Sequence, residues 1–263
     1  MRGARVRFGD RLLKAYTWLI ILWLVAPIAV MIVFGFNDKQ SKSNATWQGF
    51  TFKWYGELFA IPDLSGALIN SLVIAAASTI ITVVIGTMLG LALGRHRFRG
   101  QGATNFLVFA AISTPELVMG ASLLSLFVSA NVPRDRITIT IAHVLFSLAF
   151  VTVTVRARVV TLDPSLEEAA KDLGAGPWAT FRLVTLPSIL PGVLAGAMLA
   201  FALSIDDYVV TSFVNGSTLT FPLWIIGSVK TGIPPQVNVM GTLIFGVGVL
   251  IAIINAVAAR RRT

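Results

Sequence analysis

The chain has 263 residues, of which 56% are hydrophobic and 13% are charged, and its formal net charge is +9. A soluble core rarely needs so much apolar sequence, so the composition indicates a membrane protein. The absence of cysteine excludes a disulfide framework, a thiolate metal site and a cysteine nucleophile. Basic residues flank hydrophobic runs instead of gathering on one predicted face, which argues against nucleic-acid binding.

Six apolar runs reach or approach the roughly 20 residues that a helix needs to cross a bilayer. They cover residues 16–36, 67–93, 103–130, 137–155, 188–205 and 239–259. The first run follows a basic segment as a signal peptide would, but it is too long and lacks a small-residue cleavage site, so we expect a retained anchor. The pattern predicts an all-α polytopic membrane protein with a single transmembrane domain over residues 1–263.

The distribution of Lys and Arg predicts the orientation of these spans. Fifteen of the 21 basic residues fall in four segments, namely 1–15, 95–99, 156–187 and the basic tail 260–263, and the other three connections hold six. Since positive charge is enriched in cytoplasmic loops, both termini and the loop 156–187 are predicted to be cytoplasmic.

Small residues recur at four-residue spacing in two of the runs, at Gly86, Gly90 and Gly94 and at Gly192, Gly196 and Ala200. This spacing places small side chains on one helix face and lets two helix backbones approach closely. The pattern leaves open whether the partner helix belongs to the same chain.

The segment 163–187 is polar at its start and lies between two apolar runs. Asp163 followed by Pro164 is a favourable N-cap and first-turn pair for a helix. Gly174 suits a left-handed C-terminal position, and a second helix is expected to begin near Pro177. The segment therefore predicts a helix, a glycine bend and a second helix, which together make a compact knob that fits a groove on another protein.

This knob resembles the coupling loop, or EAA loop, of permease subunits from type I ABC importers. The resemblance rests on Glu168, Ala169, Ala170, Gly174, Leu186 and Pro187, with valine where isoleucine is usual two residues before Leu186. It implies that these residues couple the chain to a separate ATP-binding subunit by docking into a cleft on it. A helix-capping role for Glu168 is equally compatible with the sequence.

The stretches "NATWQGFTFKWY" (44–55) and "SIDDYVVTSFVNG" (204–216) extend the resemblance to the spermidine/putrescine permeases, and specifically to their second permease subunit. A departure from the family pattern is the tyrosine after the two aspartates. The resemblance implies a bacterial inner-membrane location, a second permease subunit as partner, an extracytoplasmic polyamine-binding protein, and two ATP-binding subunits that hold ATP and Mg. It also implies translocation by alternating access.

A polyamine carries ammonium groups separated by methylenes, so its pathway should offer carboxylates and aromatic faces. We predict this pathway at Glu116, Asp206, Asp207, Tyr208 and Trp47. Glu116 is the only carboxylate well inside a predicted run, where an acid is costly unless it faces a cavity or a partner, and the preceding proline should break the helix.

Plainer roles remain open for these residues. Glu116 could pair with an arginine of a partner subunit, and Asp206 or Asp207 could cap the next helix or meet the binding protein. Trp47 could be an interfacial belt residue. His143, alone in the fourth run, is expected to serve packing or hydrogen bonding, with a proton role as the alternative.

The sequence contains no GxxxxGK[ST] loop, no metal-ligand cluster and no serine–histidine–acid arrangement with the expected flanks. The chain is therefore predicted not to be an enzyme and to bind no cofactor or metal itself, so ATP hydrolysis is expected to belong to another polypeptide. Two alternatives stay open, a permease for another small organic solute and a membrane scaffold or regulator that does not transport.

Overall fold

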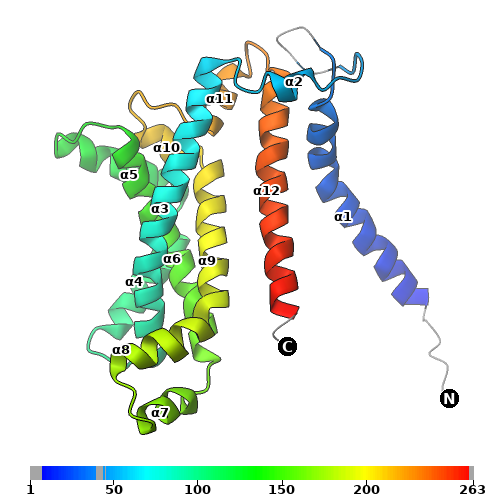
Figure 1. The fold of residues 1–263 in the computed structure, drawn as a ribbon. Coiled ribbons are helices and arrows are strands. Elements are labelled where there is room, and N and C mark those ends of the chain that lie inside the picture. The colour runs from blue at the N-terminus through cyan, green and yellow to red at the C-terminus, as the bar shows by residue number, and fades with distance from the viewer. Residues whose placement is uncertain (1–7, 40–43, 45, 261–263) are drawn as a thin grey trace, which may run out of the picture. The chain divides into compact units, whose positions relative to one another are not determined.

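The computed structural model describes residues 8–39, 44 and 46–260 (Figure 1). This part of the chain is mostly helical, with no strand beyond one isolated antiparallel bridge between Asn37 and Phe50. The chain divides into a unit formed by Gly66–Trp224 and a second unit formed by the segments on either side of it. Much of the predicted basic N-terminal segment, with Arg2, Arg5 and Arg7, and the end of the basic tail, 261–263, lie outside the described residues.

Among the described residues, four helical stretches are long and apolar enough to cross a membrane, and they match four of the six expected runs. They are Asp10–Phe34 within α1 (Phe8–Phe34), α3 (Pro62–Arg95), α6 (Arg136–Val160), and Pro177–Asp206, which joins α8 (Pro177–Thr180), η1 (Phe181–Thr185) and α9 (Leu186–Asp206). The last run lies in α12 (Pro235–Arg260), of which Pro235–Ile251 is a shorter apolar stretch. The total of six spans and the cytoplasmic side of the termini stay predictions.

The third expected run, 103–130, is not one continuous helix. It forms α4 (Gln101–Ser113) and α5 (Glu116–Ser129), which are bent by 106° relative to each other. Thr114 is extended, as a residue before proline prefers, and Pro115 cannot donate a backbone hydrogen bond to continue the α4 ladder. The expected break at the proline is confirmed, whereas the expectation of one span with Glu116 well inside it is corrected, because Glu116 lies in the first turn of α5.

In the unit Gly66–Trp224, the helix α6 is the one against which α3, α4, α9 and α10 (Val209–Val214) pack. A Cβ atom added at Gly90 of α3 would lie 3.0 Å from the side chain of Val155, and one added at Gly196 of α9 would lie 3.2 Å from Val151. Both small-residue faces predicted from the sequence therefore pack against a helix of the same chain. The close approach buries one apolar cluster between the C-terminal half of α6 and α9. Its members are Val151, Val155, Val159, Ile189, Val193 and Ala200.

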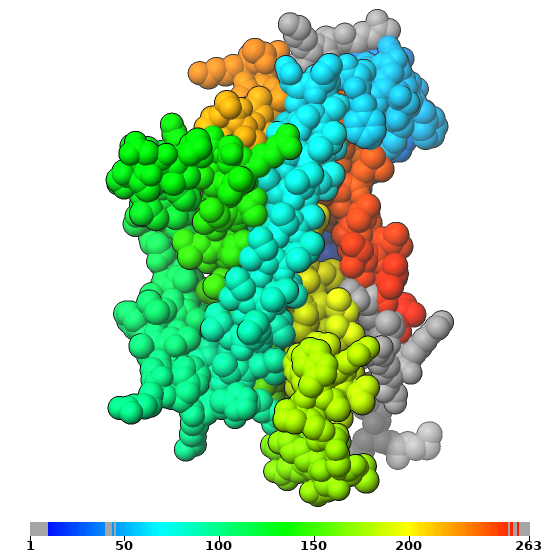
Figure 2. Space-filling view, turned by 60° about the vertical axis from the view of Figure 1, so that its left-hand side comes forward, coloured from blue at the N-terminus to red at the C-terminus, as the bar shows by residue number. Residues whose placement is uncertain are grey.

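The segment 163–187 forms the expected knob at one end of this unit (Figure 2, yellow-green). Helix α7 (Ser165–Asp172) is followed by Gly174 in the left-handed conformation, with φ of 83°, and then by α8. The carboxylate of Asp163 accepts the backbone N–H of Ser165 at 3.0 Å and so caps the start of the knob. This hydrogen bond holds the pKa of the exposed Asp163 carboxyl below its ordinary value.

The second unit contains α1, α2 (Lys53–Gly56), α12 and the second half of α11 (Phe221–Ser228). Helix α1 packs along α12, and the sulfur of Met31 lies against Gly241. After α1, the buried amide of Asn37 donates to the carbonyl oxygen of Thr46 at 2.7 Å and accepts the backbone N–H of Gln48 at 2.7 Å. This amide therefore fixes the connection that carries Trp47.

Candidate functional site

The candidate site lies where α9 ends and the chain breaks before α10. Helix α9 ends at Asp206, Asp207 is extended, and α10 begins at Val209. The carboxylate of Asp207 accepts the backbone N–H of Thr211 at 2.7 Å, its hydroxyl at 2.6 Å, and the backbone N–H of Val210 at 3.3 Å. Asp207 therefore caps α10, which confirms the capping alternative for one of the two aspartates.

His143 of α6 connects this cap to α9. Its Nε2 atom lies 2.9 Å from the hydroxyl of Thr211 and 3.3 Å from the Asp207 carboxylate, and its Nδ1 atom lies 2.6 Å from the hydroxyl of Ser204. Ser204 in turn lies 3.1 Å from Ser78 of α3. The side chains of His143 and Asp207 are only 1% and 6% exposed. The predicted hydrogen-bonding role of His143 is confirmed, and this set of five side chains is called the His143 network below.

Asp206 differs from its neighbour because its side chain is exposed. It interacts electrostatically with Asp207 and with Glu116, so the break after α9 and the first turn of α5 bring three carboxylates into one region. Glu116 is also exposed. Tyr208, two residues after Asp206, is 40% exposed. Four of the five residues predicted for the substrate pathway thus belong to one unit and cluster around one break.

Trp47, the fifth predicted pathway residue, belongs to the other unit. It is 48% exposed and meets Phe34 edge-on, with ring centroids 6.3 Å apart. Both the substrate-contact reading and the interfacial-belt reading of Trp47 therefore stay predictions.

Packing between α5 and α10 holds Glu116 beside the break. A Cβ atom added at Gly120 would lie only 2.5 Å from the ring of Phe213, so glycine is needed for this close approach. The contact continues into a buried cluster formed by Ile74, Leu123, Phe127, Ile139, Ala142, Val210 and Val214. The acids are therefore carried on a densely packed frame rather than on free loops.

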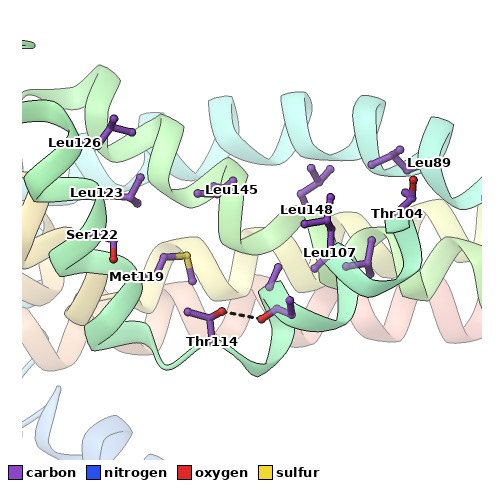
Figure 3. Close-up of a pocket in the computed structure, with 14 residues that line it drawn as sticks. Leu89, Thr104, Leu107, Thr114, Met119, Ser122, Leu123, Leu126, Leu145 and Leu148 are labelled. Atoms are coloured by element: carbon purple, nitrogen blue, oxygen red, sulfur yellow. Dashed lines mark hydrogen bonds between the residues drawn. The ribbon is translucent and has the colours of Figure 1, made fainter. Parts of the chain in front are cut away.

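A separate cavity of about 620 Å³ lies between α3, α4, α5 and α6 (Figure 3). Its wall is mostly aliphatic, with Leu107, Met119 and Leu148 among the lining residues, and the hydroxyl of Thr114 that borders it donates to the Ala110 carbonyl at 2.7 Å. No carboxylate lines this cavity. Its chemistry does not suit a polycation, so the cavity and the acidic region are distinct features of the unit.

The residues predicted for coupling lie in the knob and at the start of α9. Glu168 and Ala169 are exposed, Ala170 is half-buried, and Leu186 and Pro187 begin α9. Large apolar side chains nearby are also exposed, with Leu173 at 90%, Trp178 at 71% and Leu183 at 71%.

The acid that ties the knob to the rest of the unit is Glu167, which the sequence reasoning missed. Its carboxylate accepts the hydroxyl of Thr185 at 2.8 Å and lies 3.4 Å from the guanidinium of Arg95. The side-chain carboxylate of Glu168, by contrast, has no hydrogen bond or ion pair to any described residue, although its backbone N–H donates to the carbonyl oxygen of Pro164. The only sequence signal for Glu167 was its place in the first turn of a predicted helix, which it shares with Glu168.

The part of the chain that the structure describes contains no group of three His, Asp or Glu side chains placed to hold a metal ion.

The chain is similar to one protein family and to curated proteins with known names. Residues 86–263 match the family described as binding-protein-dependent transport system inner membrane component. The putrescine transport system permease protein PotI of Escherichia coli (strain K12) is 40% identical over 232 residues, which cover 85% of this chain and 82% of that protein. The spermidine/putrescine transport system permease protein PotC of the same strain is 38% identical over 256 residues, which cover 97% and 96%.

Among solved structures, a chain of a bacterial ABC transporter involved in the import of the acidic polysaccharide alginate aligns with a TM-score of 0.68 at 16% sequence identity, covering 100% of this chain and 99% of that one. At this identity the likeness concerns the fold, and it confirms the expected ABC importer permease fold. The family match covers more than half of the chain, and the relatives align along most of its length. The chain is therefore a multi-pass membrane protein that belongs to the family of binding-protein-dependent transport system inner membrane components.

Proposed function

We propose that this chain is a permease subunit of an ATP-driven importer that moves polyamines, spermidine or putrescine, into the cytoplasm. The observation that carries the proposal is that Glu116 and Asp206, two exposed carboxylates from different helices, lie near enough to interact electrostatically beside one packed break. Carboxylates that sit near apolar membrane segments are costly unless they serve a partner or a substrate, and a polyamine offers several positive charges to them. The names of the relatives PotI and PotC support the same substrate class.

In this proposal the two aspartates have different tasks. Asp206 and Glu116 attract the ammonium groups, while Tyr208 offers an aromatic face to the cations and to the methylene chain. Asp207 fixes the backbone of the site instead of binding the substrate, because its carboxylate already accepts hydrogen bonds from α10. Asp206 thus supplies negative charge to the pathway, and Asp207 holds the backbone around it in place.

The proposed transporter contains a second permease subunit, two ATP-binding subunits that bind ATP and Mg, and an extracytoplasmic polyamine-binding protein, all at the bacterial inner membrane. The exposed apolar side chains of the knob support its role as the surface that docks on an ATP-binding subunit. Closure of the ATP-binding pair would move the knobs together and open the permease pair outward, and hydrolysis would reset it.

The test is uptake of labelled spermidine and putrescine by cells that express the complete transporter with the native chain, Glu116→Gln or Asp206→Asn. The native complex should take up at least one polyamine, and each neutralised variant should assemble normally but transport at least about tenfold more slowly. Glu57→Gln, which neutralises an exposed acid in the other unit, serves as the control and should transport normally. If the native complex moves neither polyamine, the proposed substrate class is wrong.

A further inference from the structure

The hydrogen bonds around His143 determine which ring nitrogen carries a proton. The hydroxyl proton of Thr211 is committed to the Asp207 carboxylate at 2.6 Å, so the Thr211 oxygen can only accept from His143. The Nε2 atom of His143 must therefore carry hydrogen, which it can share between Thr211 and Asp207. In the neutral ring, Nδ1 then accepts the hydroxyl proton of Ser204.

The same contacts span the break between α9 and α10. Ser204 lies on α9, two residues before the helix ends, whereas Asp207 and Thr211 lie after it. One imidazole therefore holds the chain on both sides of the break, Nδ1 on the α9 side and Nε2 on the α10 side. Because the ring is rigid and its nitrogens point in different directions, no other single side chain in the His143 network could make both connections.

The network also explains why two adjacent aspartates face different surroundings. Two backbone N–H groups, the Thr211 hydroxyl and the His143 ring together offer four donors to the Asp207 carboxylate, so its side chain is drawn inward and buried. With Asp207 fixed and extended, Asp206 at the last residue of α9 is left exposed. The orientation of Asp206 is thus a consequence of where Asp207 is held.

We propose that His143 is a positioning residue for transport: acting through Asp207, it fixes the break between α9 and α10 so that the Asp206 carboxylate faces the substrate pathway beside Glu116. The proposal rests on the proposed function, since it assigns a task to a residue that does not itself touch the substrate. The buried network is required for the passage of the cation, beyond any contribution to folding.

Two conservative variants separate the two nitrogens. The side-chain amide of His143→Gln reaches the position of Nε2 and can still donate to Asp207, whereas the shorter amide of His143→Asn reaches only the position of Nδ1, near Ser204. His143→Leu retains volume and removes both connections. The complete transporter with each variant is reconstituted into liposomes, and spermidine or putrescine uptake and ATP hydrolysis are measured at saturating loaded binding protein.

The informative quantity is the number of polyamine molecules transported per ATP hydrolysed. His143→Gln should keep this ratio within about twofold of the native value, while His143→Asn and His143→Leu should lower it about tenfold with ATP hydrolysis largely retained. A residue with only a structural role would reduce assembly, hydrolysis and uptake together and leave the ratio unchanged, which would overturn the proposal. Equal ratios for the Gln and Asn variants would overturn it as well.

Failure of the proposed function is distinguishable from failure of this inference. If the native complex transports neither polyamine, the substrate class is wrong, and the variants are then compared by the thermal unfolding of the purified complex. The link from Nε2 to Asp207 predicts that His143→Gln unfolds at a higher temperature than His143→Asn. The opposite order would overturn the link itself.

Discussion

At its C-terminal end, α9 lies beside buried side chains that hydrogen-bond to one another. Both ring nitrogens of His143 and the carboxylate of Asp207 have partners within the same unit. At its N-terminal end, the same helix is preceded by η1 and α8, which belong to the knob. There Trp178 is 71% exposed and Leu173 is 90% exposed. The buried polar groups at one end of the helix are paired with one another, whereas the other end presents exposed apolar surface that needs a partner.

The difference shows how one helix can serve two tasks. A buried network with all its donors and acceptors paired has one favoured arrangement, so it suits a site whose geometry must be kept. The five-residue π-helix η1 joins α8 of the knob to α9, and π segments are frequent at functional positions in helices. We expect changes within the His143 network to affect stability and transport together, and changes at the knob to affect transport with little effect on stability.

The largest expected effect comes from Asp207→Ala. Removal of this carboxylate leaves the backbone N–H groups that it caps and the hydroxyl of Thr211 without their acceptor, which should cost about 3 kcal/mol of stability and lower uptake severely. The measurement is thermal unfolding of the purified complex, with uptake in parallel. Asp206→Ala is the matched control and should lower uptake while the unfolding temperature stays near that of the native complex. Equal unfolding temperatures for the two variants would show that Asp207 contributes no more to stability than Asp206 does.

The next effect comes from Gly174→Val. Its φ of 83° is unfavourable for any residue with a Cβ atom, and valine is poorly suited to it, so the bend between α7 and α8 should change even though no atom lies within 4 Å of an added Cβ. Uptake should fall at least about tenfold because the knob no longer fits its partner. Gly176→Val is the control, since Gly176 also has open space but an ordinary φ of −69°. Similar uptake by the two variants would exclude a role for the bend.

The knob was predictable from sequence because its signals are local. Asp163, Gly174 and Pro177 each constrain the backbone at their own positions, and the observed helices begin and end accordingly. The apolar runs likewise predicted the long helices, since length and hydrophobicity are properties of continuous segments.

The His143 network was not predictable because its members are distant in sequence. Ser78, Ser204 and Thr211 carry no motif, and only the packing of α3, α9 and α10 on α6 brings them to the ring. The bend of 106° after α4 shows a similar limit. Pro115 predicts that a helix breaks, but the direction of the next helix depends on the contact of α5 with α10.

Glu167 and Glu168 offer a smaller test of the knob. Glu167→Gln removes the charge that faces Arg95 and weakens the acceptor for Thr185, so the tie between α7 and the rest of the unit should loosen. Because the pair is partly exposed, the change should cost only about 0.5–1 kcal/mol and reduce uptake a few-fold. Hydrogen exchange of α7 in the assembled complex is the measurement. Glu168→Gln should leave this exchange unchanged, and faster exchange in both variants would contradict the distinction between the two acids.

The smallest expected effect concerns Asp163, the cap of the knob. Its carboxyl pKa is lowered in the folded chain by the hydrogen bond from the Ser165 amide, so the cap contributes stability above the ordinary pKa and loses it as the pH falls through the lowered value. Amide exchange in 163–172, corrected for the intrinsic rate, should therefore accelerate slightly between neutral pH and about pH 3. Asp163→Asn should remove this pH dependence while the cap persists, because the asparagine oxygen accepts the same hydrogen bond without titrating. If native and Asp163→Asn chains respond equally to acid, the start of the knob is held by contacts other than this carboxylate.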